Sequence, residues 1–157
     1  MENLQNIIDE YINSIIRISF DNLPIDKEWS KYKINVCTLK KFTEMDAEYI
    51  LESGEEISFN PKYQSNNDIS TNLTFIFLNL RDTMYKLNPD NGAWFSCIIE
   101  VDNKGKFSTK FNYDDIPNFT YWPSKEKFID DLKQYPRKQE SIPDWLNLAL
   151  NGKQVKK

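Results

Sequence analysis

Apolar residues at the start of the chain recur with the spacing of one helical face. They fall at i, i+3, i+4 and i+7, and polar residues fall mostly between them. The apolar set is Leu4, Ile7, Ile8, Tyr11, Ile12, Ile15 and Ile16. This periodicity predicts an amphipathic α-helix over residues 2–20, which ends near Asn22 and Pro24.

From Trp29 the period changes to two, which is the spacing of a half-buried antiparallel strand. One face would carry Tyr32, Ile34, Val36, Thr38 and Lys40, and the other Lys31, Lys33, Asn35, Cys37 and Leu39. Residues 47–51 and 57–59 flank the pair Ser53-Gly54, and this arrangement predicts a hairpin with its turn at that pair.

The middle of the chain, residues 69–87, fits two templates. Its β-branched and aromatic residues suit a strand, but the segment is too long for a typical strand and contains a helical stripe. The stripe is Leu73, Ile76, Phe77, Leu80, Met84 and Leu87. We therefore predict a helix with Asp68 or Ser70 as its N-cap, preceded by a polar loop at residues 60–68.

The last third of the chain contains the clearest hairpin and two short helices. Residues 93–115 alternate around a turn at Gly105, a residue that suits the left-handed position of a bulged turn. A helix is predicted from Ser124, its N-cap, to Pro136, and a second over residues 142–150.

Strands between segregated helices predict an α+β fold, with an antiparallel sheet and helices packed on one side. The chain has 157 residues, which is the size of one domain, and we expect residues 1–150 to form it and residues 151–157 to be a frayed tail. No apolar run is long enough to cross a membrane. Two cysteines in a chain without an export signal predict a cytoplasmic protein.

Composition narrows the chemistry that the chain can perform. There is no histidine, so an imidazole base, a Ser-His-Asp triad and a histidine metal ligand are all excluded. Cys37 and Cys97 lie far apart, which argues against a zinc site, and four scattered glycines form no phosphate-binding loop. Lys and Arg total 20 against 24 Asp and Glu, and this net charge of −4 argues against nucleic-acid binding. We predict no catalytic residue, metal or cofactor.

Carboxylates gather after the second hairpin, around a loop that carries Phe119, Tyr121 and Trp122. These carboxylates are Asp114, Asp115, Glu126, Asp130 and Asp131. Such a cluster suits a docking surface for a basic partner, because complementary charge accelerates association. The alternatives are a metal-assisted hydrolase that uses Asp114, Asp115 and Asp130, or a solvated acidic helix with Trp122 in the core.

Three stretches of the C-terminal half resemble a known family. They are NLRDTMY (79–85), GAWFSCIIEVDNKGKFSTKFNYDD (92–115) and FIDDLKQYPRKQESIPDWL (128–146). Their order, with a Trp-led hairpin, a GKF turn and a Y-P-R then I-P-x-W-L ending, is similar to the YezG-like family of bacterial antitoxin and immunity proteins. The resemblance covers about residues 70–146 and leaves residues 21–68 without a recognised signature.

The resemblance implies a protein without catalytic apparatus. Members of the family bind a toxin domain made by the same cell, often a nuclease in systems such as contact-dependent inhibition, and block it. Applied here, it predicts a cytoplasmic immunity protein whose partner is a cognate toxin. The expected partner-binding residues are Asp114, Asp115, Tyr121, Trp122, Glu126, Asp130 and Asp131. A carboxylate-dependent hydrolase and a small peptide-binding regulatory module remain the alternatives.

Overall fold

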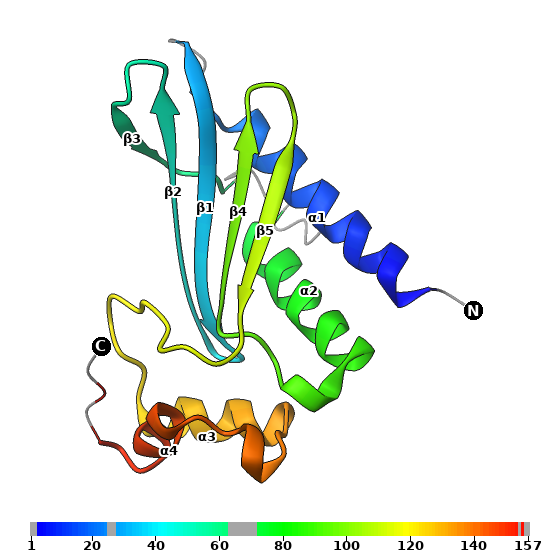
Figure 1. The fold of residues 1–157 in the computed structure, drawn as a ribbon, viewed down its shortest axis with the longest axis vertical. Coiled ribbons are helices and arrows are strands. Elements are labelled where there is room, and N and C mark those ends of the chain that lie inside the picture. Colours follow the sequence, from blue (N-terminus) through cyan, green and yellow to red (C-terminus); the bar gives the residue numbers. More distant parts are fainter. Residues whose placement is uncertain (1–2, 25–27, 63–71, 154, 156–157) are drawn as a thin grey trace.

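A five-stranded antiparallel sheet forms the centre of the computed structural model, which describes residues 3–24, 28–62, 72–153 and 155 (Figure 1). The strands are β1 (Trp29–Leu39), β2 (Phe42–Leu51), β3 (Glu56–Phe59), β4 (Ser96–Asp102) and β5 (Phe107–Asn112). Their order across the sheet is β3-β2-β1-β4-β5, so β3 and β5 are the two edges. The predicted α+β class is confirmed.

Two helices, α1 (Leu4–Asp21) and α2 (Leu73–Leu87), pack on one face of this sheet. The apolar stripe of α1 buries Ile8, Ile12, Ile15 and Ile18, which confirms the predicted amphipathic helix. The α2 helix buries Leu73, Ile76, Phe77 and Leu80 as its stripe predicted. Its first residue follows Asn72, whose side chain accepts from the Phe75 N–H, so the N-cap prediction was wrong. Asp68, Ser70 and most of the loop at 60–68 lie outside the described residues.

Both predicted hairpins are present. The turn between β2 and β3 contains Gly54, and the turn between β4 and β5 contains Gly105, each with a positive φ. On β1, residues Tyr32, Ile34 and Val36 are buried beneath the helices, and Thr38 is buried beside the β1–β2 turn, where its hydroxyl bonds to that of Thr43. The prediction was wrong at the end of this strand, because Leu39 is buried and Lys40 is exposed in the turn that follows.

A second, smaller layer closes one end of the sheet. The helices α3 (Lys125–Gln134) and α4 (Asp144–Leu150) lie below the β1–β2 turn in Figure 1. Between them is a second hydrophobic cluster of Leu39, Phe95, Phe128, Trp145, Leu146 and Ala149. Val155 also packs against this cluster, while residues 154, 156 and 157 of the predicted tail lie outside the described part of the chain.

Candidate partner-binding surface

Asp131 lies in the interior and not on a surface. Its side chain is 6% exposed and accepts two hydrogen bonds from the Arg81 guanidinium, at 2.5 and 2.9 Å. It also accepts from the Lys40 backbone N–H at 2.7 Å, while Arg81 Nε donates to the Trp94 carbonyl. A charge this deeply buried is paired for structural reasons. The expectation that Asp131 is an exposed carboxylate was therefore wrong, because α3 turns this residue toward α2.

Trp122 is half-buried and belongs to the second cluster. Its ring centroid lies 5.4 Å from that of Phe128 and 6.0 Å from that of Phe119. The aromatic loop therefore turns two of its three rings inward, which is the core alternative that the sequence left open. Only the third ring, that of Tyr121, remains largely outside, and this side chain is 75% exposed.

The remaining predicted site residues lie on the surface but in different surroundings. Asp115 and Glu126 are exposed, and Asp130 forms an ion pair with Lys41 at 3.1 Å. Asp114 pairs with Arg137 at 3.4 Å and lines a shallow hollow beside Glu140. The structure thus separates Asp114 from Asp130, and each has its own cation. Asp114, Asp115 and Asp130, which the hydrolase alternative would use together, therefore do not converge on one point.

Arg137 anchors the segment that carries Asp114. Its guanidinium donates to the carbonyls of Ala93 and Tyr113 at 3.1 and 2.7 Å and to that of Ser141 at 3.1 Å. Burial lowers the pKa of Arg137, and the Asp114 carboxylate opposes that shift. The side chain also occupies the space where a Cβ on Gly92 would lie. This end of the molecule is therefore tightly constrained around one buried cation.

The loop that presents Tyr121 is held by a residue of the sheet. The two carboxylate oxygens of Glu44 on β2 accept from the backbone N–H groups of Thr120 and Tyr121, at 2.6 and 2.9 Å. Charge-assisted bonds of this kind are shorter and stronger than neutral ones. Trp122, the next residue, anchors the loop from the inside by packing against Phe119 and Phe128. Tyr121 is therefore an exposed aromatic side chain on a backbone that is already ordered.

Tyr121 borders a groove of about 660 Å³ on the sheet face that α1 and α2 leave uncovered. We call this the open-face groove. Its lining includes Asn35, Cys37, Glu44, Asp46, Ser96, Ile98 and Tyr121, with Lys62 as the basic member. Asp115 is linked to its border, because Asn112 donates to both the Ser96 hydroxyl and the Asp115 carbonyl. Ile98, at 40% exposed, supplies an apolar patch.

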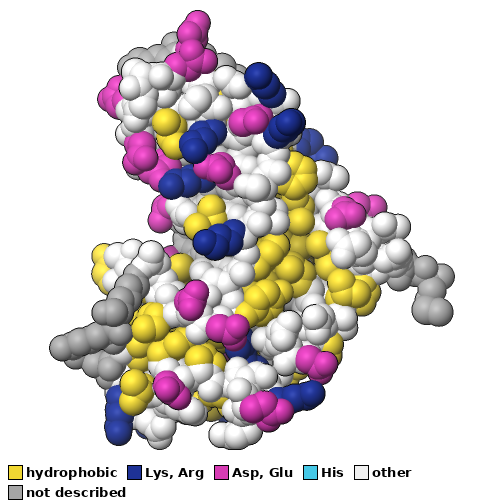
Figure 2. Space-filling model, viewed as in Figure 1, with side chains coloured by type: hydrophobic (Ala, Val, Ile, Leu, Met, Phe, Trp, Pro, Cys, Tyr) yellow, Lys and Arg dark blue, Asp and Glu magenta, His cyan; other side chains and the backbone are white. Residues whose placement is uncertain are grey.

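Charge is distributed unevenly along this open face. Cross-strand pairs join Lys31 to Glu100 at 3.1 Å and Lys33 to Glu48 at 3.2 Å, and Figure 2 shows blue and magenta side chains intermixed over the strands. Toward the groove, Asp46 accepts from Asn35 and Glu44 holds the loop. Neither carboxylate forms an ion pair among the described residues. The groove end of the face therefore carries two carboxylates outside ion pairs, together with the basic side chains of Lys62 in its lining and Lys110 opposite Ile98.

The two cysteines differ in chemistry. Cys97 is buried under the helices, and burial raises the pKa of its thiol, so this side chain stays protonated and packs as a small apolar group. Cys37 lines the open-face groove. Within the ranges that the structure describes, no three His, Cys, Asp or Glu side chains form a group that could hold a metal ion.

Sequence reasoning missed the contribution of residues 21–68. Glu44 and Asp46 lie on β2 and form the groove together with the aromatic loop, which is more than 70 positions away along the chain. A signal was present in the alternation of β1, where Lys31, Lys33 and Asn35 mark a polar face. That pattern predicts an uncovered sheet face, but it does not indicate which loop lies against it.

These features describe a small α+β protein whose distinctive parts are exposed surfaces on a rigid core. A family model described as "Immunity protein YezG-like" matches residues 1–142, and the chain therefore belongs to this family of immunity proteins. The resemblance seen in residues 70–146 is confirmed and extends through the N-terminal half. No curated protein matches the chain. In the described part of the chain, every helix is too short or too polar to cross a membrane.

Proposed function

We propose that this immunity protein binds a cognate toxin domain in the cytoplasm and neutralises it by occupying its surface, without catalysis. Membership of the immunity protein family supports the general role, since immunity proteins inhibit a toxin partner. A nuclease is the toxin class that best suits an acidic inhibitor, because nuclease domains carry basic surfaces for phosphate. A chain with a net charge of −4 attracts such a domain over distance.

The observation that carries the proposed surface is the exposed side chain of Tyr121 on a backbone that Glu44 holds in place. Tyrosine is enriched at interface hot spots, where it contributes a large contact area with few rotatable bonds. Glu44 has already ordered the backbone of Thr120 and Tyr121, so little conformational entropy is lost when a partner binds. An exposed aromatic ring held in this way is a suitable central anchor.

The proposed interface surrounds that anchor with polar groups. Asp46 in the groove lining and Asp115 at its border would supply acidic rim contacts. The exposed Glu126, with Asp114 beside Arg137 and Asp130 beside Lys41, would contribute to the acidic field farther out. Trp122 and Asp131, which were also expected at the site, would act from inside by fixing the loop and α3. Rim charges set the association rate and its salt dependence more than the affinity.

The test is co-expression with candidate toxin domains, sought first among the genes that neighbour this one, followed by affinity measurement. Tyr121→Ala should weaken toxin binding about a hundredfold, as expected for a hot-spot aromatic residue that contributes roughly 2–3 kcal/mol. Phe75→Ala is the matched control, because Phe75 is 47% exposed on α2, away from the groove. Both variants should first show the melting temperature of the natural protein.

Charge reversal tests the rim separately. Asp46→Lys together with Asp115→Lys should slow association and reduce its dependence on salt, while dissociation changes less. If Tyr121→Ala and the double reversal both bind the toxin like the natural protein, the interface lies elsewhere. If no toxin domain is bound by the natural protein at all, the inhibitory role itself is wrong.

A further inference from the structure

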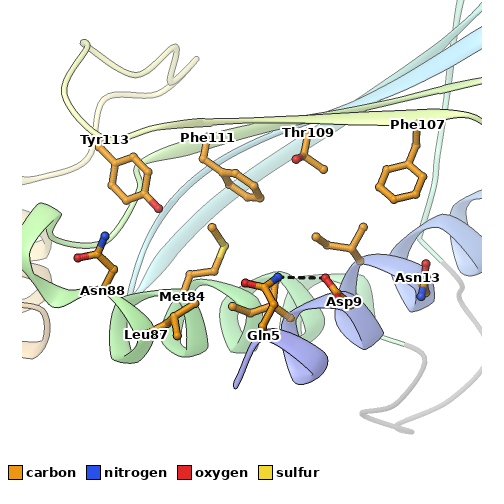
Figure 3. A pocket seen from close by; sticks show the side chains of 12 residues that line it. Gln5, Asp9, Asn13, Met84, Leu87, Asn88, Phe107, Thr109, Phe111 and Tyr113 are labelled. Carbon is orange, nitrogen blue, oxygen red and sulfur yellow. Dashed lines mark hydrogen bonds between the residues drawn. The ribbon is translucent and has the colours of Figure 1, made fainter. Parts of the chain in front are cut away.

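A second groove lies at the opposite side of the sheet, between the edge strand β5 and the helices α1 and α2. It has a volume of about 630 Å³, and we call it the β5-edge groove. Figure 3 shows Phe111 of β5 and Tyr113, just after it, pointing toward Met84 and Leu87 of α2. At the other end of the groove Phe107 lies over α1, beside Asn13. Phe107 is 49% exposed and Leu87 is 48% exposed. The two layers therefore stand apart here and leave apolar side chains in contact with water.

The strand above this groove has an unpaired side. β5 pairs with β4 and is the last strand of the sheet. The Asp102 N–H donates to the Lys106 carbonyl, and because antiparallel bonding alternates, even-numbered residues of β5 face β4. Phe107, Thr109 and Phe111 consequently direct their backbone N–H and C=O groups away from the sheet. These groups can accept a further strand.

The helices extend past this edge of the sheet. In Figure 1 the N-terminal half of α1 and much of α2 lie to the right of β5 instead of behind the strands. Figure 2 shows a band of hydrophobic side chains in that position. A sixth strand beside β5 would cover this band, and its inward-facing side chains would fill the groove that Ile8 and Ile12 line from α1.

The lysines of this edge indicate which side chains an added strand should carry on its outward face, which is the face turned away from the helices. Lys106 and Lys110 alternate with the groove-facing residues of β5, and Lys104 lies in the preceding turn. None of these three lysines forms an ion pair within the described residues. Opposite charges on neighbouring strands stabilise their pairing. An added strand is therefore favoured when its outward side chains are acidic.

We propose that β5 is a docking edge for an extended segment of a partner protein, in which apolar residues alternate with acidic ones. The segment would pair with the outward backbone groups of Phe107, Thr109 and Phe111, and its apolar side chains would enter the β5-edge groove. Main-chain pairing gives such strand addition its affinity, and the pockets give it specificity. The β5-edge groove shares no lining residue with the open-face groove, although Lys110 lies opposite Ile98 of the latter, so the strand pairing and the apolar contacts do not depend on the proposed toxin contact.

A second copy of this chain fits the edge less well than an isolated segment. Antiparallel pairing of two β5 strands would place both helix layers on the same side of the joined sheet. Because α1 and α2 already extend past β5, the helices of the second copy would be directed into the same space. An extended segment brings no helix layer with it.

The experiment uses synthetic peptides, since it needs no identified partner. The acetylated peptide EVEFEVE should bind the full-length protein in a fluorescence polarisation or NMR titration, whereas KVKFKVK and the scrambled peptide EEVVFEE should bind at least about tenfold more weakly. Thr109→Pro removes an outward N–H without breaking a bond to β4, so it should abolish binding while the fold persists. Leu87→Lys should weaken binding by placing a charge in the groove.

A charge exchange makes the assignment specific. Lys106→Glu combined with Lys110→Glu should transfer the preference from EVEFEVE to KVKFKVK. The proposal is overturned if the natural protein binds EVEFEVE no better than EEVVFEE, or if Thr109→Pro and Leu87→Lys, both shown folded by thermal melting, bind it unchanged. It is also overturned if sedimentation shows a dimer that Thr109→Pro dissociates, because a second copy would then be the occupant.

Discussion

At the residue scale, the buried pair of Arg81 and Asp131 does more for the architecture than any surface charge. Arg81 belongs to α2 and Asp131 to α3, and Asp131 also accepts from the Lys40 N–H in the β1–β2 turn. The Arg81 guanidinium lies 5.1 Å from the Tyr135 ring centroid and 5.9 Å from that of Phe95. One ion pair therefore ties the terminal helices to the sheet and to α2.

Removing one member of this pair should be costly. Asp131→Ala leaves Arg81 buried without a counter-charge, and we expect the free energy of unfolding to fall by about 3–5 kcal/mol. The neighbouring Asp130→Ala is the matched control, because its pair with Lys41 is partly exposed and should contribute less than about 1 kcal/mol. Urea denaturation of both variants measures the difference. Equal losses would contradict the structural role of Asp131.

Ionisation of the Tyr135 hydroxyl should make the free energy of unfolding depend on pH in the alkaline range. Burial, assisted by the Asp82 carboxylate to which its hydroxyl donates, raises the pKa of Tyr135 to about 12. The neutral phenol is therefore favoured in the folded protein. The stabilisation that comes from this raised pKa is fully present below the unfolded tyrosine pKa of about 10, and it is lost as pH rises toward 12.

Tyr135→Phe should accordingly reduce the loss of stability between pH 10 and 12, as measured by urea denaturation across that range. Tyr121→Phe is the control, because Tyr121 is 75% exposed. The interpretation fails if the two variants show the same alkaline profile as the natural protein.

In the turns and connections between elements, alanine substitution at two glycines with positive φ should lower the free energy of unfolding by different amounts. Gly105, in the β4–β5 turn, has φ +86 and nothing within 4 Å of an added Cβ. Gly92, with φ +76, has the Arg137 side chain where a Cβ would lie. Gly105→Ala should therefore cost about 1 kcal/mol from backbone strain alone. Gly92→Ala should cost a further ~1–3 kcal/mol because Arg137 must shift.

Thermal or urea unfolding of the two alanine variants tests this ranking. A double variant with Arg137→Ala offers an internal check, because the extra cost at Gly92 should shrink once the obstructing side chain is gone. If Gly105→Ala is the more destabilising of the two, the assigned surroundings of Gly92 are wrong.

At the scale of the whole molecule, two hydrophobic clusters have to unfold together if the chain is one domain. The larger lies between the sheet and α1–α2, and the smaller lies around Phe128 and Trp145. Leu39 and Phe95 connect the smaller cluster to the sheet, and the Arg81–Asp131 pair connects it to α2. We expect one cooperative transition in the natural protein.

Tryptophan fluorescence and far-UV circular dichroism should therefore give the same urea midpoint. In Asp131→Ala part of the fluorescence change should occur at lower urea than the dichroism change, because two of the four tryptophans, Trp122 and Trp145, report the smaller cluster. The other two, Trp29 and Trp94, belong to the larger cluster and should follow the dichroism. Separate midpoints in the natural protein would mean that α3 and α4 form an independent unit.

Local periodicity determined most of the elements from the sequence alone. The stripe from Leu4 to Ile16 has a period that only a helix can bury on one side, and the alternation from Tyr32 to Thr38 does the same for a strand. Gly54 and Gly105 marked their turns because few other residues adopt a positive φ. The ordered C-terminal motifs also pointed correctly to the YezG-like family of immunity proteins.

The side that each polar residue faces depends on contacts with residues far away along the chain, and these form only in the folded protein. Asp130 and Asp131 are adjacent in sequence and equally charged, yet one is solvated and the other is sealed against Arg81, which lies 50 positions earlier. Likewise Glu44 meets Tyr121 only because β2 and the aromatic loop come together in space. A carboxylate's role depends on its distance from a distant cation or N–H group, and local sequence spacing does not encode that distance.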